Sequence, residues 1–283
     1  MDSLVPDAIS DHSALAAQRV KGIGRLSCVR KDEITGISRL YQEGAAKIRL
    51  PKTADRAFQA VLINTAGGLT GGDRVDWEVD VEEDAAATVT TQACEKVYRS
   101  MGDEARVAVR LSVGRGGHLS WLPQETIMFD RAQLSRTIDL DMEADSQALL
   151  LESVVFGRLA MGERTANGLF RDRWNVRQQG RLVHAEAFSI GPDIGALLKG
   201  RAVANGAAAI ANILFVSPEA EQKLDAVRAI IGEGGGASFW KVAGTGKLLA
   251  RLIDEDSYNL RKRLVPLVEL LNGQAGLPKV WSL

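Results

Sequence analysis

The chain contains 283 residues, of which 46% are hydrophobic and 25% are charged, and these proportions are typical of a soluble globular protein. Lysine and arginine together number 35 and aspartate and glutamate 36, so the formal net charge is −1, which argues against nucleic acid as a partner. Two cysteines, neither in a CxxC pair, exclude a disulfide framework, and because no apolar run reaches about 18 residues we expect no transmembrane helix and no membrane partner.

The first residues of the chain, MDSLVPDAISDHSALAAQ, contain three aspartates and no apolar core. A secretory signal peptide requires such a core, so this stretch does not fit one. We expect residues 1–24 to form a flexible N-terminal tail. Together with the low cysteine content, the lack of a signal peptide predicts a cytoplasmic protein.

From about residue 25 to residue 190 the hydrophobic pattern has a period of two. In RVDWEVDVEED, residues 74–84, apolar side chains alternate with carboxylates, which is typical of a strand with one buried and one solvated face. Strands are predicted for residues 24–30, 45–51, 58–66, 74–81, 87–93, 104–114, 118–122, 135–143, 148–156, 173–178 and 181–190. Many short strands at even spacing favour a mainly β fold, either a sandwich, a barrel or a solenoid, although no strict sequence repeat is present.

The stretch NTAGGLTGGD, residues 64–73, has four glycines and lies between two predicted strands. A P-loop requires GxxxxGK[ST], and this stretch has no lysine; a dinucleotide fingerprint must open a helix, whereas the next segment alternates as a strand. The glycines instead favour tight turns, or a loop that lets another chain approach the backbone closely. The candidate partner-contact residues are Gly67, Gly68, Gly71, Gly72 and Asp73.

The last third of the chain has a helical signature at two places. In residues 217–232, Ser217 is a candidate N-cap, Pro218 suits the first helical position and Gly232 ends the pattern. Residues 257–272 have an apolar side and contain Pro266, which should kink this helix or mark its start. Between the two helices KLLARLI is predicted to be a strand. We expect residues 25–283 to form a single β-rich domain with these helical additions.

Motifs for nucleophilic or zinc chemistry are absent. The sequence has no GxSxG and no HExxH, and its three histidines belong to no recognised motif. Cys94 is interpreted as a small buried residue, with a thiolate activated by the nearby Lys96 as the alternative. Glu125 and Asp130 lie around a predicted bend, and a Glu and Asp pair could serve a β-rich carbohydrate-active hydrolase if the two carboxyl groups had the required separation.

Four stretches resemble one family closely, the urease accessory protein UreD, also called UreH. They are NTAGGLTGGD at 64–73, TTQACEKVYRS at 90–100, WLPQETIMFDRAQLSR at 121–136 and GRLAMGE at 157–163, and DRWNV follows at 172–176. Their order and spacing also resemble the family over about residues 25–190. Cys94 departs from the small residue expected at its position, which puts little in doubt because cysteine also packs as a small hydrophobe.

The resemblance implies a maturation factor and not an enzyme. Its fold would be an irregular, β-helix-like winding of strands with a few helices. Its partners would be apo-urease, the helical protein UreF and, through UreF, the GTPase UreG that supplies Ni²⁺. No tightly bound cofactor is implied, and Ni²⁺ would be bound only transiently.

The scarcity of histidine and cysteine leads to a hypothesis about nickel. Imidazole and thiolate hold Ni²⁺ tightly, whereas a protein that passes the ion on needs weaker, exchangeable ligands. The first candidates for a carboxylate-lined nickel path are Glu95, Glu125, Asp130, Glu152 and Glu163. The rival interpretation is a scaffold that only positions urease and the GTPase, and the alternative from another class is the hydrolase that uses Glu125 and Asp130.

Overall fold

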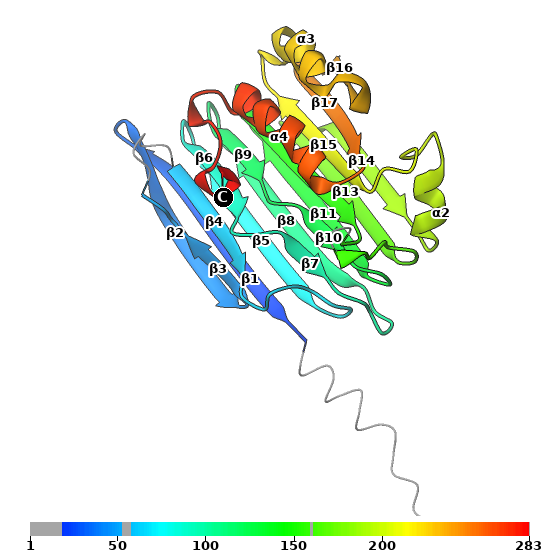
Figure 1. The fold of residues 1–283 in the computed structure, drawn as a ribbon. Coiled ribbons are helices and arrows are strands. Elements are labelled where there is room, and N and C mark those ends of the chain that lie inside the picture. The colour runs from blue at the N-terminus through cyan, green and yellow to red at the C-terminus, as the bar shows by residue number, and fades with distance from the viewer. Residues whose placement is uncertain (1–18, 53–57, 159–160, 283) are drawn as a thin grey trace, which may run out of the picture.

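The computed structural model describes residues 19–52, 58–158 and 161–282. Within them the chain forms two β-sheets, and the helices α3 and α4 lie on the outer side of one sheet (Figure 1). The seven-stranded sheet consists, in spatial order, of β14 (Arg181–Ile190), β13 (Leu169–Gln178), β11 (Gln133–Met142), β8 (Ala105–Val113), β5 (Arg74–Val81), β1 (Lys21–Lys31) and β2 (Ile34–Gly44).

The second sheet has ten strands. Its main path consists of β16 (Gly235–Val242), β17 (Thr245–Asp254), β15 (Ala209–Val216), β12 (Gln147–Phe156), β9 (His118–Leu122), β6 (Ala86–Thr91), β4 (Phe58–Asn64) and β3 (Ala46–Arg49). Two short strands lie off this path, β10 (Thr126–Met128), which pairs with β12, and β7 (Glu95–Val97), which pairs with β10.

The chain winds between the two sheets. In the order β4, β5, β6, β8, β9, β11, β12 and β13 it crosses from one sheet to the other, and neighbouring strands within each sheet pair in parallel. Antiparallel pairing is confined to the flanks, as in β1 with β2 and β12 with β15. The expected mainly β fold with an irregular, solenoid-like winding is confirmed.

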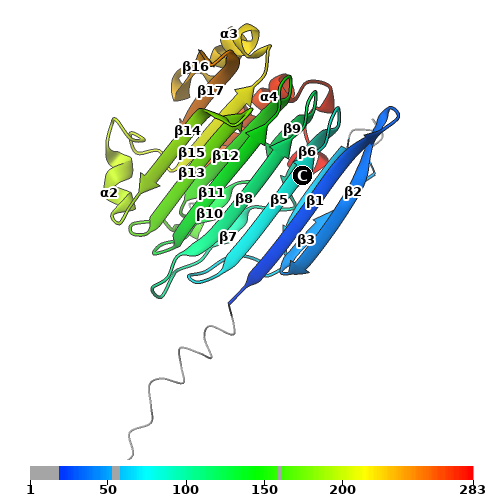
Figure 2. The same ribbon diagram turned by 180° about the vertical axis from the view of Figure 1, so that it is seen from behind.

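The two sheets differ in how they are covered, and the sequence reflects the difference. The inner strands of the seven-stranded sheet, which Figure 2 shows from its outer side, bury about every second residue, so β5 has the alternating pattern expected of a half-exposed strand. The ten-stranded sheet packs one face against the other sheet and much of its opposite face against the helices. All of β15 is therefore buried. Its sequence is a continuous apolar run without alternation, so the period-two pattern did not predict this strand.

The C-terminal helices lie close to where the sequence predicts them. The first, α3 (Ala220–Ile231), begins three residues later than expected, because the Ser217 hydroxyl accepts a hydrogen bond from the Glu219 amide in a turn that precedes the helix. The second, α4 (Ser257–Asn272), has Pro266 inside it, so this proline does not mark the start of the helix. A short helix, α2 (Ile194–Lys199), was not predicted.

The strand β1 begins at Lys21 and not after residue 24, the expected end of the tail. The first 18 residues of that expected tail lie outside the described residues. In the part of the chain that the structure describes, every helix is too short or too polar to cross a membrane.

Candidate functional site

The space between the sheets contains a buried cluster of charged side chains. Arg136 on β11 binds Asp172 on the neighbouring strand β13 through two hydrogen bonds, Nε to Oδ1 at 3.0 Å and Nη2 to Oδ2 at 2.7 Å. Its Nη1 donates to Glu152, which comes from β12 in the opposite sheet. Glu152 also accepts a hydrogen bond from the Trp121 indole at 2.9 Å. The three charged side chains are no more than 6% exposed, so the cluster joins the sheets inside the core.

The cluster holds two carboxylates and only one guanidinium, so the two negative charges are not both balanced. Burial raises the pKa of Glu152 to about 7, although the Arg136 charge acts in the opposite direction. Burial also disfavours the charged form of Arg136, but Asp172 and Glu152 outweigh it and the pKa of the guanidinium is raised. Arg136 therefore stays charged, while burial favours the protonated form of Glu152.

Glu95 belongs to the same interior. Strand pairing places Glu95 of β7 beside Thr126 of β10, and residues paired in this way lie on the same face of a sheet. The Thr126 hydroxyl lies 3.3 Å from Arg136 Nη1. The Glu95 carboxylate accepts hydrogen bonds from Asn64 Nδ2 at 3.2 and 3.3 Å. Burial raises the pKa of Glu95 to about 7, against the effect of the Asn64 hydrogen bond. Glu95 thus lies in register beside Thr126, and Thr126 in turn contacts Arg136, the partner of Glu152.

Polar groups continue beyond Glu152 toward the edge formed by β14 and β17. Glu152, Asn212 and Arg251 are in register on three adjacent strands, and Arg251 forms an ion pair with Glu186 of the other sheet. Among the described residues, Asn212 Oδ1 is buried and has no hydrogen-bond partner. Trp174 Nε1 and His184 Nε2, at inward-facing positions of β13 and β14, are likewise buried and have no hydrogen-bond partner among these residues. Buried polar atoms of this kind are usually satisfied by ordered water.

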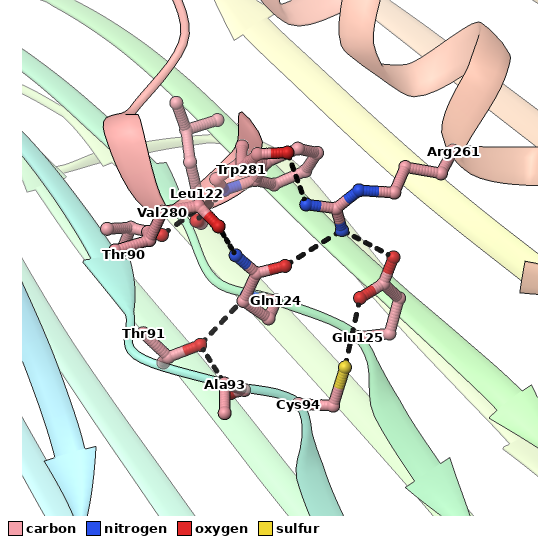
Figure 3. Close-up of polar contacts among 10 residues, drawn as sticks. All are labelled: Thr90, Thr91, Ala93, Cys94, Leu122, Gln124, Glu125, Arg261, Val280 and Trp281. Atoms are coloured by element: carbon pink, nitrogen blue, oxygen red, sulfur yellow. Dashed lines mark hydrogen bonds and ion pairs between the residues drawn. The ribbon is translucent and has the colours of Figure 1, made fainter. Parts of the chain in front are cut away.

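Glu125 lies on the other side of the ten-stranded sheet, under α4 (Figure 3). Arg261 of α4 donates to Glu125 Oε1 at 2.9 Å, to Gln124 Oε1 at 2.8 Å and to the Trp281 carbonyl at 2.8 Å. The Cys94 thiol donates to Glu125 Oε2 at 3.2 Å. Burial, together with the Glu125 charge, raises the pKa of Cys94 to about 12. Cys94 is therefore a protonated, structural thiol and not a nucleophile.

The C-terminal segment closes this second cluster. Trp281 is 3% exposed, and its indole donates to Thr90 Oγ1 and to the Leu122 carbonyl, both at 3.2 Å. Gln124 Nε2 donates to the Val280 carbonyl at 3.1 Å. The C-terminus and α4 thereby fix the segment that leads from β9 into β10.

Asp130 and Glu163 hold a loop together. Asp130 Oδ1 accepts hydrogen bonds from the amides of Ala166 at 2.9 Å and Asn167 at 3.0 Å. Glu163 accepts from the Asp130 amide at 3.0 Å and pairs with Arg158. Since Asp130 is bound to backbone amides and Glu125 to Arg261, neither carboxylate is presented as a free acid or nucleophile of the kind that a glycosidase needs.

The glycine loop at 64–73 packs tightly against its neighbours. A Cβ on Gly68 would lie 2.4 Å from the Tyr98 ring, and one on Gly71 would lie 2.2 Å from the Ser100 hydroxyl. Gly67 has a φ of +75° but faces open space. The Asp73 carboxylate is buried and accepts hydrogen bonds from the amides of Val20 and Thr70. Gly68, Gly71 and Asp73 therefore have the expected structural role in this turn. Gly67 is exposed, and its contact with a partner stays a prediction. Gly72 has a φ of +87° and packs near Arg19.

Two central residues, Arg136 and Asp172, were not predicted as site residues. A signal for them exists in the strand pattern. Arg136 occupies the inward phase of β11, and Asp172 occupies that of β13. A charge at a position where the alternation requires an apolar residue indicates a buried pair. Arg261 of α4 is turned inward onto Glu125.

These features define a mainly β, solenoid-like protein with ionisable side chains between its sheets. A family model described as UreD urease accessory protein matches residues 20–282. The urease accessory protein UreD of Mesorhizobium japonicum is 59% identical over 274 residues, covering 97% of this chain and 98% of the relative. The urease accessory protein UreD 1 of Brucella anthropi is 57% identical, covering 95% and 96%, and that of Brucella melitensis is 56% identical, covering 96% and 97%. The chain belongs to the UreD family, and a role in urease maturation follows.

Proposed function

We propose that this chain is a non-enzymatic, cytoplasmic scaffold that binds apo-urease, recruits UreF and the GTPase UreG, and assists the delivery of nickel to the urease active site. Membership of a family of urease accessory proteins supports the role in maturation. The named partners and the nickel step go beyond it and rest on the resemblance together with the interior described above.

The observation that carries the nickel step is the line of polar groups between the sheets. Glu95 and Glu152 face this interior, and Thr126 and Arg136 lie between them. Burial raises the pKa of both carboxyl groups, and a carboxylate must lose its proton to bind a metal ion, so nickel binding here would release protons. Carboxylate, amide and water oxygens hold Ni²⁺ less tightly than imidazole or thiolate, so the ion can enter and leave.

The other three carboxylates have different roles in this proposal. Glu125 is neutralised by Arg261, and Asp130 and Glu163 bind backbone amides. They position the strands and loops around the interior without contacting the ion. Nickel would pass Glu95 and Glu152, so we propose these two as the transient ligands among the five candidates.

A scaffold without a nickel path remains the second candidate, and one observation favours it. Arg136 bonds to both Glu152 and Asp172, and a guanidinium in that position opposes a divalent cation by charge repulsion. In this alternative the interior cluster only joins the two sheets.

The test of the maturation role is urease activation in cells. The gene for this chain is deleted from a strain that carries the urease subunits and the other accessory proteins, and urease activity and urease-bound nickel are measured with excess Ni²⁺ in the medium. The proposal predicts that activity and nickel fall together and that the wild-type chain restores both. Normal urease maturation in the deletion strain would overturn it.

A further inference from the structure

On the outer face of the seven-stranded sheet, the face that Figure 2 shows, basic residues lie in register on four of five adjacent strands, near the end where β1 begins. Strand register aligns Lys21 of β1 with Arg74 of β5 and Arg74 with Arg106 of β8. Ser135 of β11 continues the register to Arg171 of β13. The four basic side chains, Lys21, Arg74, Arg106 and Arg171, are all on exposed residues. We call this set the basic row.

The second row along from it on the same face has a different arrangement. There Arg25, Glu78, Arg110 and Asp139 are in register on the same succession of strands, and their charges alternate in sign. Arg25 and Glu78 form an ion pair at 3.2 Å. Opposite charges at paired positions stabilise a sheet and like charges destabilise it. The basic row therefore works against the stability of the sheet, and a binding role explains why it is there.

The carboxylates near the basic row neutralise only one of its four members. Asp73 is buried and bound to backbone amides, and Glu104 pairs with Arg171. Among the residues that the structure describes, Lys21, Arg74 and Arg106 have no ion-pair partner. Three adjacent positive charges thus remain exposed to a partner.

We propose that the basic row is a docking surface for an acidic segment of apo-urease. This inference rests on the proposed function for the identity of the partner, and on the basic row for its charge. Arg74 directly follows the glycine loop, and Asn64 of that loop binds Glu95. The basic row therefore lies at the end of the molecule where the interior carboxylates begin, which is where the recipient of an ion would have to bind.

The length and width of the basic row favour a protein segment over nucleic acid as its partner. Four strand spacings of about 4.8 Å give the row a length of roughly 19 Å, which suits one acidic helix or a short loop. The next row contains Glu43 and Asp76, both in register with Ile23 of β1, and Arg173 at its β13 end. Apart from Arg173 the positive surface is therefore one row wide, whereas a duplex needs a broader basic footprint.

The test compares two charge-reversed full-length chains. The variant R74E/R106E changes the basic row, and R173E/R177E makes the same change in net charge on the same sheet face outside it. Each chain is titrated with apo-urease at about 50 mM and about 300 mM salt, since screening weakens exposed charge contacts. We expect R74E/R106E to bind at least about tenfold more weakly at low salt and to lose most of the salt dependence, and the control to stay within about twofold of wild type.

Several results would overturn the proposal. One is wild-type affinity of R74E/R106E for apo-urease, and another is an equal loss of affinity in the control. A third is that R74E/R106E still binds urease but loses a salt-sensitive self-association or a salt-sensitive binding to duplex DNA that the wild-type chain shows. If R74E/R106E has a lowered Tm, the neutral variant R74Q/R106Q replaces it. The proposed function fails separately, if the wild-type chain does not restore urease activity in the deletion strain.

Discussion

Arg136 and Glu152 form an ion pair that connects the two sheets from inside the core. Its partners come from different sheets, and both side chains are almost fully buried. Replacement of Arg136 by methionine leaves Glu152 and Asp172 buried without their counter-charge, so we expect a loss of about 3–5 kcal/mol in the free energy of unfolding. Urea denaturation measures it. The control R25M breaks the half-exposed pair with Glu78 and should cost less than about 1 kcal/mol; equal losses would contradict a structural role for the interior pair.

The partly buried carboxyl group of Glu95 should make the protein less stable as the pH rises. The folded protein holds this proton to about pH 7, whereas the unfolded chain releases it near pH 4.3. Stability from this group is complete below about pH 4 and is lost as the pH rises to 7, with a total of roughly 3–4 kcal/mol.

Glu95→Gln cannot ionise, so at pH 8 it should be more stable than wild type, and the difference should vanish near pH 4. Urea midpoints across this range check it, with Glu83→Gln on an exposed turn as the control. A pH dependence identical to wild type in Glu95→Gln would show that the carboxyl group is not desolvated.

His184 should have the opposite effect on stability. Burial and the nearby charges of Lys247 and Arg251 lower its pKa to about 4, compared with about 6.5 in the unfolded chain. The folded state therefore binds fewer protons between these values, and stability present above pH 6.5 is lost as the pH falls toward 4. His184→Gln should remove up to about 3 kcal/mol of this acid destabilisation. The exposed His118→Gln is the control, and an unaltered acid transition in His184→Gln would contradict the assignment.

Trp281 should contribute strongly to stability although it lies two residues from the end of the chain. It is 3% exposed, whereas Trp240 is 44% exposed. Trp281→Ala removes a buried ring and its hydrogen bonds, so we expect a loss of about 3–5 kcal/mol, compared with less than about 1 kcal/mol for Trp240→Ala. Thermal unfolding of the two variants gives the comparison. A small effect at Trp281 would mean that the C-terminal segment does not hold Arg261 in place.

The glycine loop offers a matched pair of substitutions. Alanine at Gly68 would place a methyl group against the Tyr98 ring and 2.8 Å from the Lys96 carbonyl, while alanine at Gly67 meets open space. We expect Gly68→Ala to lower the Tm by several degrees more than Gly67→Ala, which bears only the cost of about 1–2 kcal/mol for its positive φ. If Gly67→Ala keeps its fold but binds apo-urease more weakly, the loop is a contact; equal Tm values for the two variants would contradict the packing.

How far the sequence predicts the fold depends on solvent exposure. Period-two alternation revealed strands such as β5, because one face of the seven-stranded sheet meets water. The fully buried β15 and the exposed edge strand β2 have no such alternation and were missed. The winding itself followed from the family resemblance and not from the pattern.

The candidate site was predictable in part. Glu95 and Glu152 were selected because they are carboxylates in or next to family-like motifs, and they lie in the interior. Their partners were not foreseen, because the contact of Arg136 with Glu152 depends on how one sheet faces the other, which local spacing does not encode. Nor does the sequence show that Glu125 and Glu152 point to opposite sides of one sheet.

The nickel content of urease tests the central claim most directly. Cells that lack the native chain are supplied with the E95Q/E152Q variant, and nickel bound to purified urease is measured after the complex of the variant with apo-urease has been verified. If nickel passes these two carboxylates, urease contains as little nickel as in the deletion strain although the complex forms. Wild-type nickel content in urease matured by this variant would contradict the path and leave the chain as a scaffold.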